Sequence, residues 1–412
     1  MVRPRGRTAL ATLSVGILGV LASINPGVPV SEVSLHDGGV WVTNEQLRLV
    51  AHLNFSSRTL DGGLRAPSPR FDISQAAQDV LIHDAEGSAI LPVDVATVAA
   101  GAPMRVAGVK VVQGGTFVAV SDPAAGKVWG LDVASLGGFA PETATPLADG
   151  LPGAQAVVGA DGSIHAVAND GRQTSVERVG DTWAAPRTRT LVAATAEGGL
   201  ALSSVGPDAV VLNRGTRTLH LPGRDVVDPS FADAVIQSPG EIADSVTLAT
   251  PTELLVVPLG AGEIRRISAS GVSAKGVPVA PVVLGGCRYA AWSGVGRYVR
   301  DCPGESDDVA KDVDKWRTAK NLVFRTNRDV VAINDTSNGD VFLASKQIHL
   351  VNNWKDILSA LESNDTNDKK SPETQQEQAL PQRDDKNRKP DAVNDTFGVR
   401  PGRASVLPVL QN

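Results

Sequence analysis

The chain has few of the residues that usually carry out chemistry or recognise nucleic acids. Only 4% of its 412 residues are aromatic, and it contains two cysteines and six histidines. No His-x-x-x-His, Cys-x-x-Cys or Asp-x-Asp-x-Asp-Gly pattern occurs, so the sequence gives no signal for a zinc site or an EF-hand. A net charge of −6 argues against nucleic-acid binding and against a polybasic lipid-binding surface. We therefore predict no metal, no cofactor and no nucleic-acid partner.

Motifs for nucleophilic catalysis and phosphate binding are also missing. The chain has no Gly-x-Ser-x-Gly and no Ser-x-x-Lys sequence, and Gly285-Gly286 leads into a predicted strand rather than a helix. Two histidines precede aspartates, in His36-Asp37 and His83-Asp84. Each pair lies where a strand enters a turn, so we interpret the aspartate as a turn cap and expect the histidine to be exposed. We predict no catalytic residues.

The N-terminus has the pattern of an export or anchoring segment. Arg3, Arg5 and Arg7 precede an apolar stretch from Ala9 to Ile24, which Pro26 follows. We predict a signal anchor within residues 1–31, with the arginines in the cytoplasm and the bulk of a single-pass protein outside the cell membrane. Two alternatives stay open: a signal peptide cleaved after Ala22, which would give a secreted protein, and a buried core helix.

Cys287 and Cys302 flank a predicted hairpin whose loop is Ser293-Gly-Val-Gly296. In that register Cys287 is opposite Cys302, Arg288 opposite Asp301 and Trp292 opposite Arg297. The sequence therefore predicts a disulfide, a charge pair and a cation–π contact in one hairpin. The alternative is two buried free thiols.

A short motif recurs along the chain: a hydrophobic strand, Asp, three residues, Gly and a second strand. It occurs around Asp84, Asp122 and Asp335, where Asp caps the turn and Gly supplies a positive φ. Weaker copies and the cysteine hairpin place further turns at the following positions: 44, 169, 213, 258 and 293. The mean spacing of about 42 residues is typical of four-stranded propeller blades.

We therefore predict an all-β protein with a seven- or eight-bladed β-propeller over residues 32–361. A pair of β-sandwiches with chance spacing is the structural alternative. Within the propeller, Val309, Val313 and Trp316 have helical spacing and predict a short amphipathic helix over Asp308–Lys320. A second short helix is predicted over Trp354–Leu361.

The C-terminal part has a different composition. Residues 362–391 are rich in charge and interrupted by proline, which predicts a disordered linker. Residues 392–412 turn apolar again, and Pro390, Ala392, Asp395, Val409, Leu410 and Asn412 match the start of bacterial immunoglobulin-like repeats. They predict the first strands of an Ig-like β-sandwich, in a chain that is the front of a longer protein.

Taken together, the anchor, the Val40-Trp-Val-Thr-Asn44 propeller motif, the linker and the Ig-like start resemble actinobacterial membrane-anchored surface proteins with Ig-like or fibronectin type III repeats. The resemblance implies a non-catalytic binding or scaffold role in the cell envelope. Its partner would be an unknown protein or a cell-wall polysaccharide. The first alternative is an extracellular carbohydrate-active hydrolase or lyase, with carboxylates on separate blades. The second is an envelope sensor, for which the short cytoplasmic end leaves little room.

Overall fold

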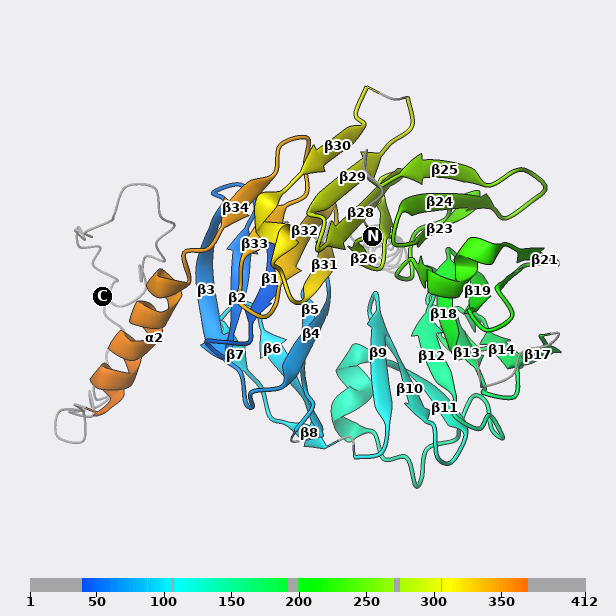
Figure 1. The fold of residues 1–412 in the computed structure, drawn as a ribbon. Coiled ribbons are helices and arrows are strands. Elements are labelled where there is room, and N and C mark those ends of the chain that lie inside the picture. Colours follow the sequence, from blue (N-terminus) through cyan, green and yellow to red (C-terminus); the bar gives the residue numbers. More distant parts are fainter. Residues whose placement is uncertain are drawn as a thin grey trace, which may run out of the picture. The chain divides into compact units, whose positions relative to one another are not determined.

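The computed structural model describes residues 39–86, 88–105, 107–191, 199–269, 275–304 and 306–369. Consecutive stretches of the propeller region form eight antiparallel sheets, each paired only within itself, and Figure 1 shows them as blades around a central axis. The prediction of an all-β propeller is confirmed, with eight blades, and the alternative of two β-sandwiches is wrong.

Each blade is a local run of the chain, with strands that follow one another in sequence. Blades 1 to 4 contain the following strands: β1 (Gly39–Asn44), β2 (Leu49–Asn54), β3 (Thr59–Arg65); β4 (Phe71–Ala76), β5 (Asp79–Asp84), β6 (Ala89–Asp94), β7 (Ala99–Ala100), β8 (Met104–Arg105); β9 (Lys110–Gly114), β10 (Phe117–Asp122), β11 (Lys127–Asp132); β12 (Gln155–Val158), β13 (Ile164–Val167), β14 (Arg172–Val176) and β17 (Arg187–Thr190). A small hairpin, β15 (Arg178–Val179) and β16 (Thr182–Trp183), lies within blade 4.

The second half of the ring has the same organisation. Blades 5 to 8 contain the following strands: β18 (Leu200–Val205), β19 (Asp208–Asn213), β20 (Thr218–Leu221), β21 (Arg224–Val227); β22 (Val235–Ile236), β23 (Ser245–Ala249), β24 (Glu253–Pro258), β25 (Arg265–Ser268); β26 (Val277–Pro278), β27 (Val282–Leu284), β28 (Cys287–Ser293), β29 (Arg297–Asp301), β30 (Val309–Asp312); β31 (Leu322–Asn327), β32 (Val330–Asp335), β33 (Val341–Leu343) and β34 (His349–Val351). Within the described part of the chain, 3-10 helices connect strands at η1 (Val133–Gly138), η3 (Pro229–Asp233) and η4 (Asp314–Arg317).

The repeated Asp–Gly turns join the second and third strands of their blades. Asp122 ends β10, its carbonyl accepts a 2.8 Å bond from Gly126 N, and Gly126 has φ 69°. Asp335 and Gly339 repeat this arrangement in blade 8, with the same 2.8 Å bond and φ 82°. We call the face of the ring at which these turns lie the Asp-turn face. The turn chemistry read from the sequence is confirmed at these positions.

Blade 1 differs from its neighbours because its described residues form three strands, and the turn after β1 is the one that matches the Asp–Gly turns. By this register β1 corresponds to the second strand of the other blades. The inner strands of the flanking blades, β4 and β31, both contact β1 and also contact each other. They therefore lie across the place that an inner strand of blade 1 would take.

Side-chain amides from the flanking blades satisfy the free edge of β1. Gln75 pairs with Trp41, through Trp41 N to Oε1 at 2.7 Å and Nε2 to Trp41 O at 2.9 Å. Asn334 pairs with Thr43 in the same way, at 2.8 Å and 3.0 Å, and Asn327 Nδ2 donates to Gly39 O at 3.0 Å. Buried backbone groups need partners. These three amides supply them in place of a strand and also close the ring between blades 8, 1 and 2.

The hydrophobic core is distributed between adjacent blades. One buried cluster joins Val210 and Leu212 of blade 5 to Val246 and Leu255 of blade 6, around Phe231 of η3. Small and branched aliphatic side chains fill these interfaces, which explains how a chain with few aromatic residues builds a large core.

The predicted helix over Asp308–Lys320 is wrong. Val309 lies in β30, where it is opposite Arg300 of β29, and only Asp314–Arg317 are helical, as η4. The blade has an edge that a fourth strand can pair with, and pairing with it outweighs the helical spacing of three apolar residues.

The second predicted helix forms and is longer than expected. Helix α2 (Trp354–Lys369) extends into the segment for which the sequence predicts a disordered linker. Among the described residues no helix has the length and apolarity to cross a bilayer. The anchor predicted between Ala9 and Ile24, the rest of the predicted linker and the predicted Ig-like strands of residues 392–412 lie outside the described residues.

Candidate binding site

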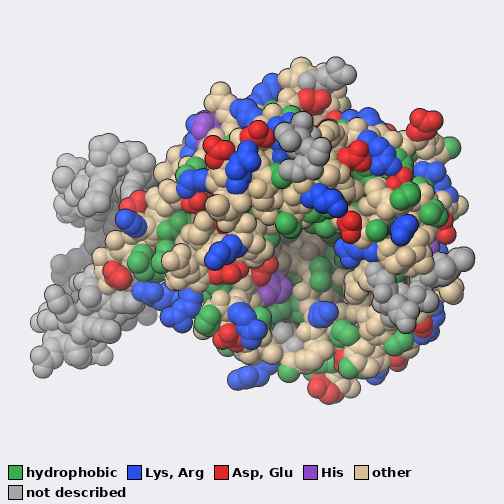
Figure 2. Space-filling view, in the orientation of Figure 1, with side chains coloured by type: hydrophobic (Ala, Val, Ile, Leu, Met, Phe, Trp, Pro, Cys, Tyr) green, Lys and Arg blue, Asp and Glu red, His purple; other side chains and the backbone are tan. Residues whose placement is uncertain are grey.

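The propeller has a cavity at each face. Strand direction alternates within a blade, so turns after first strands lie opposite the Asp-turn face. The cavity at the Asp-turn face has a volume of about 730 Å³ and lies between blades 2 and 3. We call it the Asp-turn cavity. The cavity at the other face, about 470 Å³, is lined by residues after the first strands, including Ala77, Gly115 and Ala160. Figure 2 shows the propeller hollowed at its centre, with acidic and histidine side chains on one wall.

The Asp-turn cavity combines an apolar floor with charged and polar groups. Phe71, Ile90 and Val111 supply apolar surface, and the polar lining residues are Glu45, Arg70, Asp72, His83, Asp84 and Lys110. They come from the start of β4, the end of β5, the start of β9 and the turn of blade 1. A concave site with a few convergent polar groups is the common form of a ligand site.

Asp72 and His83 are directly opposite each other in the pairing of β4 with β5, so their side chains lie on the same face of blade 2. Asp72 Oδ1 accepts a 2.8 Å bond from Ile73 N and a second bond from Arg325 Nη2. Arg325 is 7% exposed and also donates to Ile73 O at 3.2 Å. The arginine thus anchors one oxygen of Asp72 from behind the cavity.

His83 belongs to a chain of hydrogen bonds that links blades 2 and 3. Its Nε2 lies 2.8 Å from Ser74 Oγ, and Ser74 Oγ donates to Gln113 Oε1 at 2.7 Å. Burial lowers the pKa of His83 below its ordinary value, and the nearby Arg325 charge lowers it further, although Asp72 opposes both. His83 is therefore neutral at pH 7.

The neutral state of His83 can be checked by an NMR titration of the imidazole resonances. We expect the His83 midpoint to lie below about 6.5, the ordinary histidine pKa, because the folded protein holds this ring in a buried site. A His83 midpoint above the ordinary value would show that the Asp72 charge dominates instead.

His83 and Asp84 have different roles at the end of β5. Asp84 does cap its turn: its Oδ1 accepts a hydrogen bond of 3.1 Å from Glu86 N and another of 2.6 Å from Ser68 Oγ. His83, however, is half-buried and lines the cavity, so the prediction that it is exposed is wrong. Its partner Asp72 lies eleven positions earlier, and only the pairing of β4 with β5 brings them together. His36 and Asp37 lie outside the described residues.

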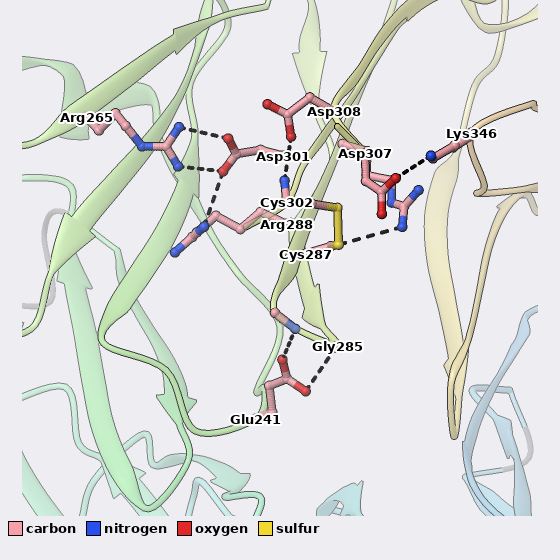
Figure 3. The surroundings of a disulfide bond; sticks show 12 residues. Glu241, Arg265, Gly285, Cys287, Arg288, Asp301, Cys302, Asp307, Asp308 and Lys346 are labelled. Atoms are coloured by element: carbon pink, nitrogen blue, oxygen red, sulfur yellow. Dashed lines mark hydrogen bonds and ion pairs between the residues drawn. A yellow bond between two sulfur atoms is a disulfide. The ribbon is translucent and has the colours of Figure 1, made fainter. Parts of the chain in front are cut away.

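The predicted cysteine hairpin forms as β28 and β29, with Cys287 and Cys302 joined in a disulfide (Figure 3). Arg288 is opposite Asp301 and Trp292 opposite Arg297, as the sequence predicts. Arg288 Nη1 lies 3.2 Å from Asp301 Oδ2, which confirms the charge pair. The free-thiol alternative is wrong.

The cation–π contact predicted in this hairpin is wrong. Trp292 is fully buried in a cluster with Ala249 and Leu254, and its Nε1 donates to Thr250 O at 2.6 Å. Arg297 instead forms an ion pair with Asp312 at 2.9 Å. Burial between blades and a carboxylate on the next strand outweigh the ring contact.

Asp301 joins the hairpin to blade 6. Arg265 donates to both of its oxygens, with the Nη1 to Oδ1 bond at 2.8 Å (Figure 3). Burial raises the pKa of this carboxyl, but the hydrogen bonds and charges of Arg265 and Arg288 outweigh burial and hold the pKa below its usual range. Charged hydrogen bonds from two arginines therefore hold Asp301 in place, and the carboxylate links blades 6 and 7.

Reduction of the disulfide is expected to lower the free energy of unfolding by about 3 kcal/mol, because the bond closes a loop of roughly 15 residues in the unfolded chain. Denaturant unfolding with and without a thiol reductant measures the effect. A Cys287→Ser, Cys302→Ser variant should unfold at the lower midpoint and be insensitive to reductant. Equal midpoints for the oxidised and reduced protein would contradict the expectation.

Five of the six tryptophans are buried. Trp41, Trp129, Trp292, Trp316 and Trp354 are each at most 4% exposed. Trp183 packs edge-on against Phe117, with ring centroids 6.2 Å apart. The described residues contain no group of three His, Cys, Asp or Glu side chains placed to hold a metal ion. Among the tryptophans, only Trp183 is partly exposed, and its ring contacts Phe117.

Comparison with known proteins supports the fold. No protein-family model matches the chain, and no curated protein matches it by sequence. Among solved structures, the dihydro-heme d1 dehydrogenase NirN is similar at a TM-score of 0.50 and 11% identity, covering 81% of this chain and 75% of that chain. BamB from Moraxella catarrhalis has a TM-score of 0.44 at 14% identity, covering 73% and 91%. Virginiamycin B lyase from Staphylococcus aureus has 0.43 at 11% identity, covering 64% and 89%. At these identities the similarity indicates the fold alone.

Proposed function

We propose that the chain is a non-catalytic binding protein of the bacterial cell envelope, located outside the cytoplasmic membrane and attached to it by the N-terminal segment. The Asp-turn cavity receives part of a protein partner. On the sequence resemblance, residues 392–412 begin an Ig-like repeat of a surface protein. The disulfide is consistent with an oxidising compartment.

One observation carries the proposal: the Asp-turn cavity is large, open and lined by polar side chains that belong to hydrogen-bonded networks. Asp72 is held by Arg325, Asp84 by Ser68, and Glu45 accepts from Thr336 Oγ1. Carboxylates fixed in this way present a rigid, charged surface, and rigid surfaces bind with a low entropic cost.

A carbohydrate-active enzyme has less support. Such sites use stacking aromatic rings, and the described tryptophans are occupied in the core or in the Phe117 contact. We therefore favour a protein over a cell-wall polysaccharide as the partner.

The test is capture of partners from envelope extract by the full-length, exported chain. Ala85 is exposed and lines the Asp-turn cavity, so Ala85→Trp fills it. Ala160 is exposed at the opposite cavity, and Ala160→Trp is the matched control. We expect Ala85→Trp to abolish capture and Ala160→Trp to retain it. Undiminished capture by Ala85→Trp, or no capture by the unmodified chain, would reject the proposal.

A further inference from the structure

We propose that Asp72 and His83 form a subsite for a protonated amino or guanidinium group, such as a lysine or arginine side chain of the partner. The inference deepens the proposed function, on which it rests for the role of the Asp-turn cavity. It follows from the hydrogen-bonding capacity that these two side chains have left within the cavity.

The hydrogen bonds around His83 determine which ring nitrogen carries the proton. Gln113 Nε2 donates to Asp79 O at 3.0 Å, which fixes the amide so that Oε1 accepts from Ser74 Oγ. Ser74 has one hydroxyl proton, and this bond uses it. His83 Nε2 must therefore donate to Ser74 Oγ, across 2.8 Å.

This assignment makes Nδ1 of neutral His83 a hydrogen-bond acceptor. A neutral imidazole carries one proton, and that proton is on Nε2. The ring lines the Asp-turn cavity, and the described residues supply no hydrogen bond to Nδ1. The wall therefore presents a lone pair to any ligand that enters.

Asp72 supplies a second acceptor beside it. Both of its hydrogen bonds in the described structure go to Oδ1, from Ile73 N and from Arg325 Nη2. Oδ2 is left for the cavity, and the side chain is 60% exposed. Because Asp72 and His83 are register partners, the two acceptors lie side by side. A group with several N–H donors and a positive charge fits such a pair, since a charged hydrogen bond is stronger than a neutral one.

The other charges that line the cavity are compatible with a cation. Arg70 forms an ion pair with Glu86, and its side chain is 77% exposed. Glu86 and the solvent therefore weaken the repulsion between Arg70 and a cation in the cavity. Glu45 and Asp84 add carboxylates. Lys110 is the opposing charge: it is exposed at the start of β9, where its flexible stem allows the ammonium to move into solvent. Arg325 lies behind Asp72 and neutralises it in part.

Nitrogen-15 NMR of histidine-labelled, full-length protein tests the inference in two steps. In the free protein, the His83 resonances should be those of a ring protonated at Nε2. Titration with ethylammonium and with ethylguanidinium should then shift His83 Nδ1, whereas acetate should not. A ring protonated at Nδ1, or a shift with acetate alone, would overturn the proposal.

Variants separate this inference from the proposed function. Asp72→Asn should weaken binding of either cation about tenfold or more, the effect of removing a charged acceptor. Lys110→Gln should strengthen it. Asp94→Asn is the matched control, because Asp94 caps a turn of the same blade through Ala96 N and Thr97 N. If Ala85→Trp abolishes partner capture while Asp72→Asn leaves cation binding unchanged, the subsite is rejected and the proposed function stands.

Discussion

Replacing Asn334 with alanine is expected to lower the free energy of unfolding by about 2–6 kcal/mol, because two buried backbone groups lose their partners at about 1–3 kcal/mol each. Asn334 is fully buried, and its amide bonds both Thr43 N and Thr43 O. These groups lie on the edge of β1 that no strand of the described residues pairs with. Chemical denaturation of the purified variant measures the loss.

Asn338→Ala is the control for this experiment. Asn338 is in the same blade, but its side chain is exposed. Its contact with blade 1 is made by the backbone carbonyl, which accepts a hydrogen bond of 2.9 Å from Asn44 Nδ2. We expect a change within about 0.5 kcal/mol, as for most surface substitutions. Similar losses for both variants would show that the amide does not hold the ring closed.

Trp316→Ala is expected to cost about 3–5 kcal/mol, the usual cost of removing a fully buried large aromatic side chain. Trp316 is 0% exposed and lies between two rings, with centroids 6.1 Å from Tyr298 and 5.4 Å from Phe342, both nearly perpendicular to it. The substitution opens a cavity between blades 7 and 8. Thermal and denaturant unfolding should both shift.

Trp316→Phe separates packing from hydrogen bonding. The indole Nε1 has no hydrogen-bond partner in the described structure, so the substitution by phenylalanine breaks no hydrogen bond. It also keeps an aromatic ring between Tyr298 and Phe342. We expect a much smaller loss than for alanine. If phenylalanine were as destabilising as alanine, packing of the ring would not be the source of the stability.

Local chemistry explains the parts of the fold that could be predicted. Asp122 and Gly126, like Asp335 and Gly339, specify a turn by residues four apart, and the spacing of such turns leads to blades. The cysteine hairpin could also be predicted from the sequence, because its loop determines which residues of the two strands are opposite each other. Each of these features depends on neighbours in the sequence.

The features that sequence reasoning missed depend on distant neighbours. Asn334 and Thr43 are 291 positions apart, and Gln75 and Trp41 are 34 apart. No spacing rule connects an amide to the strand edge that it satisfies, so the way in which amides from blades 2 and 8 complete the edge of β1 could not be foreseen. His83 was misjudged for the same reason, since the turn beside it explained Asp84 but not the facing Asp72.

The disagreement at Val309 has a different cause. Val309, Val313 and Trp316 have helical spacing, yet Val309 pairs with Arg300 at a blade edge. Of the three residues, Trp316 is fully buried. The available strand edge decided the backbone conformation at Val309, and the helical spacing did not.

The central claim is that the Asp-turn face binds a partner in the envelope, and site-specific photo-cross-linking in intact cells tests it most directly. A photoreactive amino acid would replace Ala85 at the Asp-turn cavity or Ala160 at the opposite cavity. We predict a discrete cross-linked protein at position 85 that Asp72→Asn diminishes, and none at position 160. Adducts of equal yield at both positions, or none at position 85, would contradict the claim.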